Sequence, residues 1–273
     1  MPDIQQHLAV SQKVAFEDLD WDAARASGLS AVERTNLGFF ADIESQTFFY
    51  MLEVAKLETA RDPDLISFLT MWNYEEHFHS QAILRLMREC GTPVEAAGTR
   101  AAGVRAAARL RAKVEDTLQM TLARAMPQTF VALWMTWGAS QELLTCFGYE
   151  ALVQTTKNPV LAELARRIGK QERRHFAYYF ASARERLEGD RFAQRVVRTI
   201  VERNWNPVGS GVKSPEDQAT FIENLFPAPA KLFAEADERM ASLPGLDGIR
   251  PCTAWLERAA PRLVADATAR RAS

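Results

Sequence analysis

The pattern Glu-x-x-His occurs twice in the chain, at Glu76–His79 and at Glu172–His175. Residues three apart on an α-helix lie on one face, so in each motif the carboxylate and the imidazole can bind the same ion. A separate glutamate precedes each motif by about thirty residues, Glu44 before the first and Glu142 before the second. Two helices that carry Glu alone and two that carry Glu-x-x-His form the ligand pattern of a di-metal carboxylate four-helix bundle.

Hydrophobic periodicity predicts a helix around each of these residues. The first begins after Ser30, with Glu33 completing a capping box, and keeps Glu44, Phe48 and Met51 on its apolar side. The others are predicted at about 63–89, 128–155 and 159–187, bounded by Pro and Gly breaks. Further helices are predicted at about 190–205, at 214–225 and nearer the C-terminus, whereas residues 1–30 are predicted to form an irregular arm anchored by Phe16, Leu19 and Trp21.

The sequence therefore predicts an all-α fold built on a four-helix bundle. We expect a single domain over residues 1–273, with the bundle core at about 30–187 and a C-terminal helical extension at about 188–273. The third helix is apolar nearly all round, which is typical of a buried helix. Glu142 is the only charged residue in it before Glu150, and small residues lie within a turn of it.

Six residues form the candidate metal-binding set: Glu44, Glu76, His79, Glu142, Glu172 and His175. Four carboxylates buried together would be strongly unfavourable without cations, and two divalent ions would balance their charge. Oxygen donors with one imidazole per metal favour iron or manganese over a thiolate zinc site. Glu75 and Gln171, which directly precede the motif glutamates, are candidates to orient the imidazoles, with Glu75 toward His175 and Gln171 toward His79.

Charge and cysteine content exclude several classes of protein. The 33 basic and 35 acidic residues indicate neither a nucleic-acid partner nor an anionic membrane surface. Cys90, Cys146 and Cys252 have no Cys-x-x-Cys spacing, so neither a disulfide framework nor a zinc-thiolate site is expected. A reducing cytoplasm fits this usage. We expect no signal peptide near the N-terminus and no transmembrane helix, because no apolar run reaches about eighteen residues.

The stretch at 94–113 is rich in Ala and Arg, and includes Arg100, Arg105 and Arg109. Most basic runs of this kind are solvated helix faces. The alternative is a docking face for an acidic carrier domain, based on complementary charge.

Three segments resemble the soluble acyl-carrier-protein desaturases. Residues 72–79, WNYEEHFH, are similar to that family's Trp-x-x-Glu-Glu-x-x-His segment. Residues 141–145, QELLT, and 168–175, IGKQERRH, look like its Gln-Glu-x-x-Thr and Asp-Glu-x-Arg-His segments, with Gln171 in place of the Asp. The resemblance covers about residues 18 to 187.

The resemblance implies a ferritin-like bundle with a di-iron centre, in which manganese is the alternative metal at one or both positions. It further implies a cytoplasmic homodimer that uses dioxygen and an external, ferredoxin-type electron donor. The implied reaction is desaturation of an acyl or similar apolar substrate, which is either free or attached to an acyl carrier protein. Thr145 corresponds to a threonine beside the oxygen-binding position, and Trp72 to a tryptophan on the electron route.

Two alternative interpretations of the same ligand pattern stay open: a di-iron hydroxylase or N-oxygenase, and a non-catalytic metal-binding or iron-storage ferritin-like protein. A hydroxylase or N-oxygenase of a biosynthetic pathway would use a similar centre. A ribonucleotide reductase small subunit would be expected to have its radical tyrosine where Ile83 stands, and an arylamine N-oxygenase a further histidine where Ile168 stands. Ferritin-type iron storage proteins have much shorter chains, and a metal-free scaffold would be expected to lack one of the six ligands.

Overall fold

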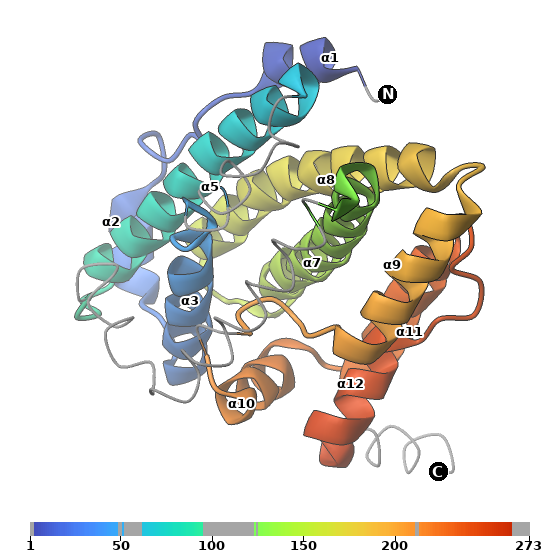
Figure 1. The fold of residues 1–273 in the computed structure, drawn as a ribbon. Helices are drawn as coiled ribbons and strands as arrows, with labels where there is room; N and C mark the ends of the chain where they lie inside the picture. Colours follow the sequence, from blue (N-terminus) through green and yellow to red (C-terminus); the bar gives the residue numbers. More distant parts are fainter. Residues whose placement is uncertain are drawn as a thin grey trace. The chain divides into compact units, whose positions relative to one another are not determined.

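The computed structural model describes residues 3–48, 51, 62–94, 123, 125–210 and 213–263 (Figure 1). Over these ranges the regular elements are helices, and the only β-type pairing is an isolated bridge between Ser210 and Lys213. The all-α prediction is thus confirmed for the described part of the chain, and the ferritin-like bundle stays a prediction. The basic run at 94–113 lies, apart from its first residue, outside the described residues.

The chain divides into two compact units. The N-terminal unit comprises Asp3–Met120 and Gly148–Gln171, and the C-terminal unit comprises Met1–Pro2, Thr121–Phe147 and Glu172–Ser273. Two long helices, α7 (Pro127–Thr155) and α8 (Pro159–Leu187), run from one unit into the other. The prediction of one domain over residues 1–273 is left untested by this division.

The N-terminal unit is organised around α5 (Pro63–Glu89), which contacts α1 (Ile4–Val10), α2 (Trp21–Ser27) and α3 (Ala31–Glu44). Burying a large apolar side chain is worth about 1.5–3 kcal/mol, so this core supplies much of the stabilisation. Its largest fully buried members are Leu37, Phe40, Leu65, Phe68, Leu69, Ile83, Leu86 and Tyr149.

The ends of α5 follow from local sequence. Asp62 accepts hydrogen bonds from the amides of Asp64 and Leu65, and Pro63 occupies the first turn, where no amide hydrogen is needed. At the other end Gly91 has φ of 69°, and the Thr92 amide donates to the Met87 carbonyl at 2.9 Å. This pattern terminates the helix because glycine adopts the left-handed conformation without steric cost.

The expectation of an irregular arm over residues 1–30 holds for residues 11–20 but is wrong at 4–10 and 21–27, where α1 and α2 form. Both are short helices with an aspartate cap: Asp3 accepts from the amides of Gln5 and Gln6, and Asp20 accepts from that of Ala23. Seven residues are too few to be helical alone in water, so packing against α5 stabilises both. Of the expected anchors, Leu19 is buried, whereas Phe16 and Trp21 are half-buried.

The first predicted bundle helix is interrupted after Glu44. α3 ends there, a turn follows at Ser45 and Gln46, and Thr47, Phe48 and Met51 are helical again. The Ser45 hydroxyl donates to the Asp42 carbonyl at 2.8 Å and the Thr47 hydroxyl to the Glu44 carbonyl at 2.9 Å, so side chains take acceptors that a continuing helix would use. Phe48, expected on the apolar side, is exposed.

Asn158 joins α2 to the start of α8. Its carbonyl oxygen accepts from the amides of Val160 and Leu161 at 3.0 and 3.1 Å, which caps α8. Its side-chain amide donates to the Ala24 and Gly28 carbonyls at 3.2 and 2.8 Å. The side chain is 2% exposed, so each of these hydrogen bonds satisfies a group that water does not reach.

The C-terminal unit adds four shorter helices to its parts of α7 and α8. They are α9 (Arg191–Asn204), α10 (Pro215–Leu225), α11 (Pro229–Ala241) and α12 (Pro251–Ala259), and α12 contacts the other three (Figure 1). Trp205, which follows α9, is 1% exposed and donates from Nε1 to the Ser140 hydroxyl on α7 at 2.8 Å. These helices agree with the elements predicted from residue 190 onward.

Candidate metal centre

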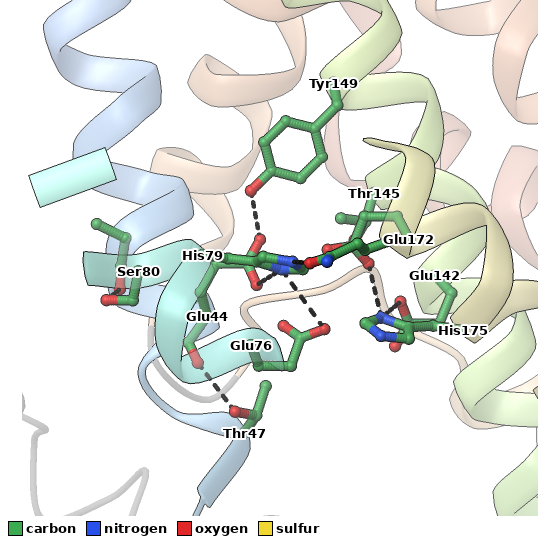
Figure 2. A network of polar contacts seen from close by, with 12 residues as sticks. Glu44, Thr47, Glu76, His79, Ser80, Glu142, Thr145, Tyr149, Glu172 and His175 are labelled. Atoms are coloured by element: carbon green, nitrogen blue, oxygen red, sulfur yellow. Dashed lines mark hydrogen bonds and ion pairs between the residues drawn. The ribbon is translucent and has the colours of Figure 1, made fainter. Parts of the chain in front are cut away.

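Glu44, Glu76 and His79 form the first cluster of candidate ligands, entirely within the N-terminal unit. Glu44 is the last residue of α3, and the other two share one face of α5. His79 Nδ1 lies 3.6 Å from Glu44 Oε2 and 3.9 Å from Glu76 Oε1 (Figure 2). Each of the three offers a ligand atom within 4.8 Å of those of the others, and all three are buried. We call these three residues the first triad.

The end of α3 is held against α5 by a side-chain contact beside the first triad. Ser80, which follows His79, donates from its hydroxyl to the Ala41 carbonyl at 3.2 Å (Figure 2). Ser80 is 2% exposed. This bond joins the last turn of α3 to the ligand-bearing turn of α5, and so it helps to fix Glu44 relative to His79.

Tyr149 is a functional candidate that the sequence analysis missed. Its hydroxyl donates to Glu44 Oε1 at 2.5 Å (Figure 2), and its ring is stacked on Phe40 with centroids 4.6 Å apart. Tyr149 follows Glu142 by seven residues, two turns along α7, so both lie on one helix face. That spacing was the available signal, but in a helix that is apolar nearly all round the pattern does not distinguish Tyr149 from the core residues beside it.

Gln171 contacts the outer nitrogen of His79. Gln171 Oε1 lies 2.7 Å from His79 Nε2, and this is the pairing that the sequence analysis expected. Glu75, the other expected orienting residue, is 0% exposed and accepts a hydrogen bond from the Gln12 amide at 3.0 Å. Its expected contact with His175 would join the two units and stays a prediction.

Glu142, Glu172 and His175 form the second cluster, entirely within the C-terminal unit, and we call them the second triad. Glu142 lies on α7 and the other two on α8. His175 Nδ1 lies 3.8 Å from Glu142 Oε2 and 3.4 Å from Glu172 Oε2 (Figure 2). Their ligand atoms also lie within 4.8 Å of one another, and all three residues are buried.

The two residues assigned to oxygen and electron chemistry are both buried. Thr145, one turn after Glu142, is 8% exposed, and its hydroxyl donates to the Gln141 carbonyl at 3.1 Å. The lone pairs of that hydroxyl remain available to accept. Trp72 is 6% exposed and lies one turn before Glu76 on α5. Ile83 and Ile168, the positions that distinguish two of the alternatives, are each 0% exposed.

Both triads have the composition of a site for a divalent cation. Each contains two carboxylates and one imidazole, and neither contains a cysteine. Two ionised carboxylates removed from water are costly to bury unless a cation or a set of hydrogen bonds balances them. Such oxygen and nitrogen donors suit iron or manganese better than a soft, thiolate-preferring metal. The described residues therefore fit a metal ion in each triad.

Comparisons of the chain with protein-family models, with characterised proteins and with solved structures found no match. Over the ranges that the structure describes, no helix is both long enough and apolar enough to cross a membrane.

Proposed function

We propose that the first and second triads are the two halves of one dinuclear centre that binds two iron ions. The observation that carries the proposal is the repetition of one buried ligand set, two carboxylates and one imidazole, with Glu-x-x-His on α5 and again on α8. A di-metal carboxylate bundle takes one Glu from each of two helices and Glu-x-x-His from each of the other two. Glu44, Glu76 and His79 of the first triad and Glu142, Glu172 and His175 of the second would hold the two ions.

The centre is proposed to support dioxygen-dependent oxidation of an acyl or similar apolar substrate. A reduced di-iron site supplies the means to activate dioxygen. For desaturation, adjacent carbons lose two hydrogens and dioxygen becomes two waters. An external donor supplies the two remaining electrons, and two protons come from solvent. The same proposal includes a substrate attached to an acyl carrier protein and a ferredoxin-type electron donor. It also includes a homodimeric assembly and a cytoplasmic location.

The surrounding residues have distinct proposed roles. Thr145 presents a hydroxyl beside Glu142, where it can orient a proton near the reacting oxygen atoms. Trp72 is proposed to lie on the electron route, as the resemblance to the desaturases implies. Tyr149 and Gln171 hold Glu44 and His79 in orientation through hydrogen bonds of 2.5 and 2.7 Å. Burial of these groups keeps water away from the reacting atoms.

Metal stoichiometry tests the metal centre itself. Anaerobic loading with iron(II) should give about two irons per chain, as expected for a di-iron bundle. Adding oxygen should then give a transient near-ultraviolet or visible absorption band. Glu142→Ala should remove activity and at least one metal while the helical circular dichroism persists. Retained turnover in this variant, or native protein that binds neither iron nor manganese after reconstitution, would contradict the proposal.

Product mass identifies the reaction. Oxygen-dependent mass spectrometry of acyl substrates, free and carrier-bound, should show the loss of two hydrogens for desaturation. Gain of one oxygen would instead identify a hydroxylase or N-oxygenase. Storage is distinguished by stoichiometry, because a storage protein takes up many irons per chain with no organic product, whereas an enzyme consumes oxygen in step with the product.

A further inference from the structure

Residues 11–19, between α1 and α2, form a segment that we call the strap. Val14 and Leu19 are its buried apolar residues, at 2% and 8% exposed. Arg167 on α8 fastens it, donating to the Ala15 carbonyl at 2.9 Å and to both carboxylate oxygens of Asp18 at 2.6 and 3.0 Å. The strap is therefore held by apolar burial and by one arginine.

The backbone of Gln12 contacts the residues that precede both motif glutamates. Its N–H donates to Glu75 Oε1 at 3.0 Å, and its carbonyl accepts from Gln171 Nε2 at 2.9 Å. The residue itself is exposed, so these contacts come from the backbone and do not depend on the side chain at this position. All of these groups lie within the N-terminal unit.

The hydrogen-bond donors and acceptors around Gln171 determine the tautomer of His79. A carbonyl oxygen can only accept, so the NH₂ group of Gln171 must face Gln12. The carboxamide oxygen of Gln171 then faces His79 Nε2 at 2.7 Å, which requires the proton to be on Nε2. Nδ1 keeps its lone pair, and it is Nδ1 that lies toward Glu44 and Glu76. This is the tautomer in which His79 can bind a metal beside those two carboxylates.

We propose that the backbone carbonyl of Gln12 is a positioning element for the metal centre. It orients the Gln171 amide, which sets the tautomer of His79, so docking of the strap and binding of a divalent metal by the first triad are coupled. The proposal rests on the metal-binding part of the proposed function and not on its oxygen chemistry. Coupling of this kind is reciprocal. If docking of the strap raises the metal affinity by some factor, bound metal raises the equilibrium constant for docking by the same factor.

The amide at position 171 explains why such a contact is needed. A carboxamide has two chemically different ends, and without the Gln12 carbonyl it could rotate and present NH₂ to His79. His79 Nε2 would then have to accept, and the ring proton would move to Nδ1, where it blocks the metal. The two oxygens of a carboxylate are equivalent, because both can only accept hydrogen bonds. A glutamate at position 171 should therefore orient His79 whether the strap is docked or not.

The test uses Co(II), which reports its binding by its visible spectrum, on the full-length chain. Arg167→Met removes the contacts to Ala15 and Asp18. The matched control is Arg166→Met, because Arg166 pairs with Glu163 as Arg167 does but makes no hydrogen bond to residues 11–19. Val14→Asp, which places a charge at a buried position, is the second way to undock the strap. Amide hydrogen exchange over residues 11–19 shows whether each variant has done so.

We expect undocking to weaken Co(II) binding about tenfold, the lower end of the effect seen when partners of metal ligands are removed. Arg166→Met should leave the affinity unchanged. In a Gln171→Glu background, Arg167→Met should no longer affect the affinity. Bound Co(II) should in turn slow exchange over residues 11–19 in the native chain by a similar factor. An undocked strap with native Co(II) affinity would overturn the proposal.

A readout without metal separates the two proposals. Nitrogen-15 NMR of the histidine side chains in the metal-free chain should show the proton of His79 on Nε2, and Arg167→Met should shift the population toward Nδ1. If the native chain binds no Co(II) but this tautomer shift occurs, the metal-binding proposal fails and the positioning contact stands. If the tautomer does not respond to undocking, the positioning role fails even where Co(II) binds.

Discussion

Gly138 on α7 lies directly against the ring of Tyr179 on α8. A Cβ atom at position 138 would be 2.4 Å from Tyr179 Cε1, a separation that real side chains do not adopt. Trp134, one turn earlier on α7, also contacts this ring, with centroids 5.5 Å apart. Gly138 is one turn from Glu142, and Tyr179 is one turn from His175. The close approach of the helices therefore occurs beside the second triad.

Gly138→Ala is expected to destabilise the chain by about 1–3 kcal/mol, the usual effect of overpacking a core. The ring of Tyr179 is enclosed between helices and cannot move aside freely, so α7 and α8 should separate locally. Metal affinity of the second triad should fall as Glu142 moves from His175. Chemical denaturation and metal titration measure the two effects. The loss of unfolding free energy in the double variant with Tyr179→Leu should be smaller than the sum of the losses in the two single variants. Additive losses would contradict the steric explanation.

Tyr149→Phe tests the hydrogen bond to Glu44. The change removes one oxygen atom and leaves the ring stacked on Phe40. We expect metal affinity to fall about tenfold, as when an outer partner of a metal ligand is lost, while the helical content stays the same. Isothermal titration with Mn(II) measures the affinity. Phe40→Leu is the comparison that disturbs the stack but keeps the hydroxyl, and an equal loss in both variants would assign the effect to packing alone.

The helix ends were predictable wherever a strong local signal stands at the boundary. α5 and α8 begin and end as predicted because Asp62-Pro63 and Asn158-Pro159 start them and Gly91 and Gly189 follow their ends. α1 and α2 could not be predicted, because their stability comes from α5 and not from their own seven residues. The interruption of the first predicted helix after Glu44 depends on hydroxyl hydrogen bonds that compete with the backbone, and apolar periodicity contains no sign of them.

The candidate ligands could be located from sequence because spacing on a helix determines which side chains share a face. The i to i+3 spacing brought Glu76 to His79 and Glu172 to His175. The partners of those ligands were harder to predict. Tyr149 reaches Glu44 across 105 positions of the chain, and Gln12 contributes only its backbone N–H and carbonyl. A backbone contact leaves no residue preference, so no pattern of residue types could have indicated the contacts of Gln12, although Leu19 was expected as an anchor of the same segment.

Asp237 on α11 stabilises the start of α12 through tertiary contacts. Its carboxylate accepts from the amides of Cys252 and Thr253 at 2.8 and 2.9 Å, and also from the Thr253 hydroxyl. Asp237→Ala should cost about 3 kcal/mol, because buried amides lose an ionised acceptor. Asp237→Asn should cost less, because its one carbonyl oxygen can still accept. Urea denaturation measures both against Glu238→Ala, an exposed neighbour expected to have little effect.

Acid should weaken the attachment of the strap. The hydrogen bond from Arg167 lowers the pKa of Asp18 below its ordinary value of 3.8, and the same arginine lowers the pKa of Glu163. A carboxyl group whose folded-state pKa is depressed stabilises the fold above its unfolded pKa, and this contribution is lost as pH falls through the folded-state value. Carbon-13 NMR titration should show the pKa of Asp18 rising toward 3.8 in Arg167→Met. An unchanged titration would show that the arginine does not hold the strap.

Asn158 has a consequence for the order in which the chain folds. Its carbonyl oxygen caps α8 through amides two and three residues away, whereas its amide hydrogens reach carbonyls 130 and 134 positions earlier. The cap can form as soon as α8 does, but the bonds to α2 must wait until a very long loop has closed. One side chain thus takes part in both an early and a late event of folding. Replacement by aspartate, which keeps the cap and removes the donors, should leave the folding rate nearly unchanged and accelerate unfolding.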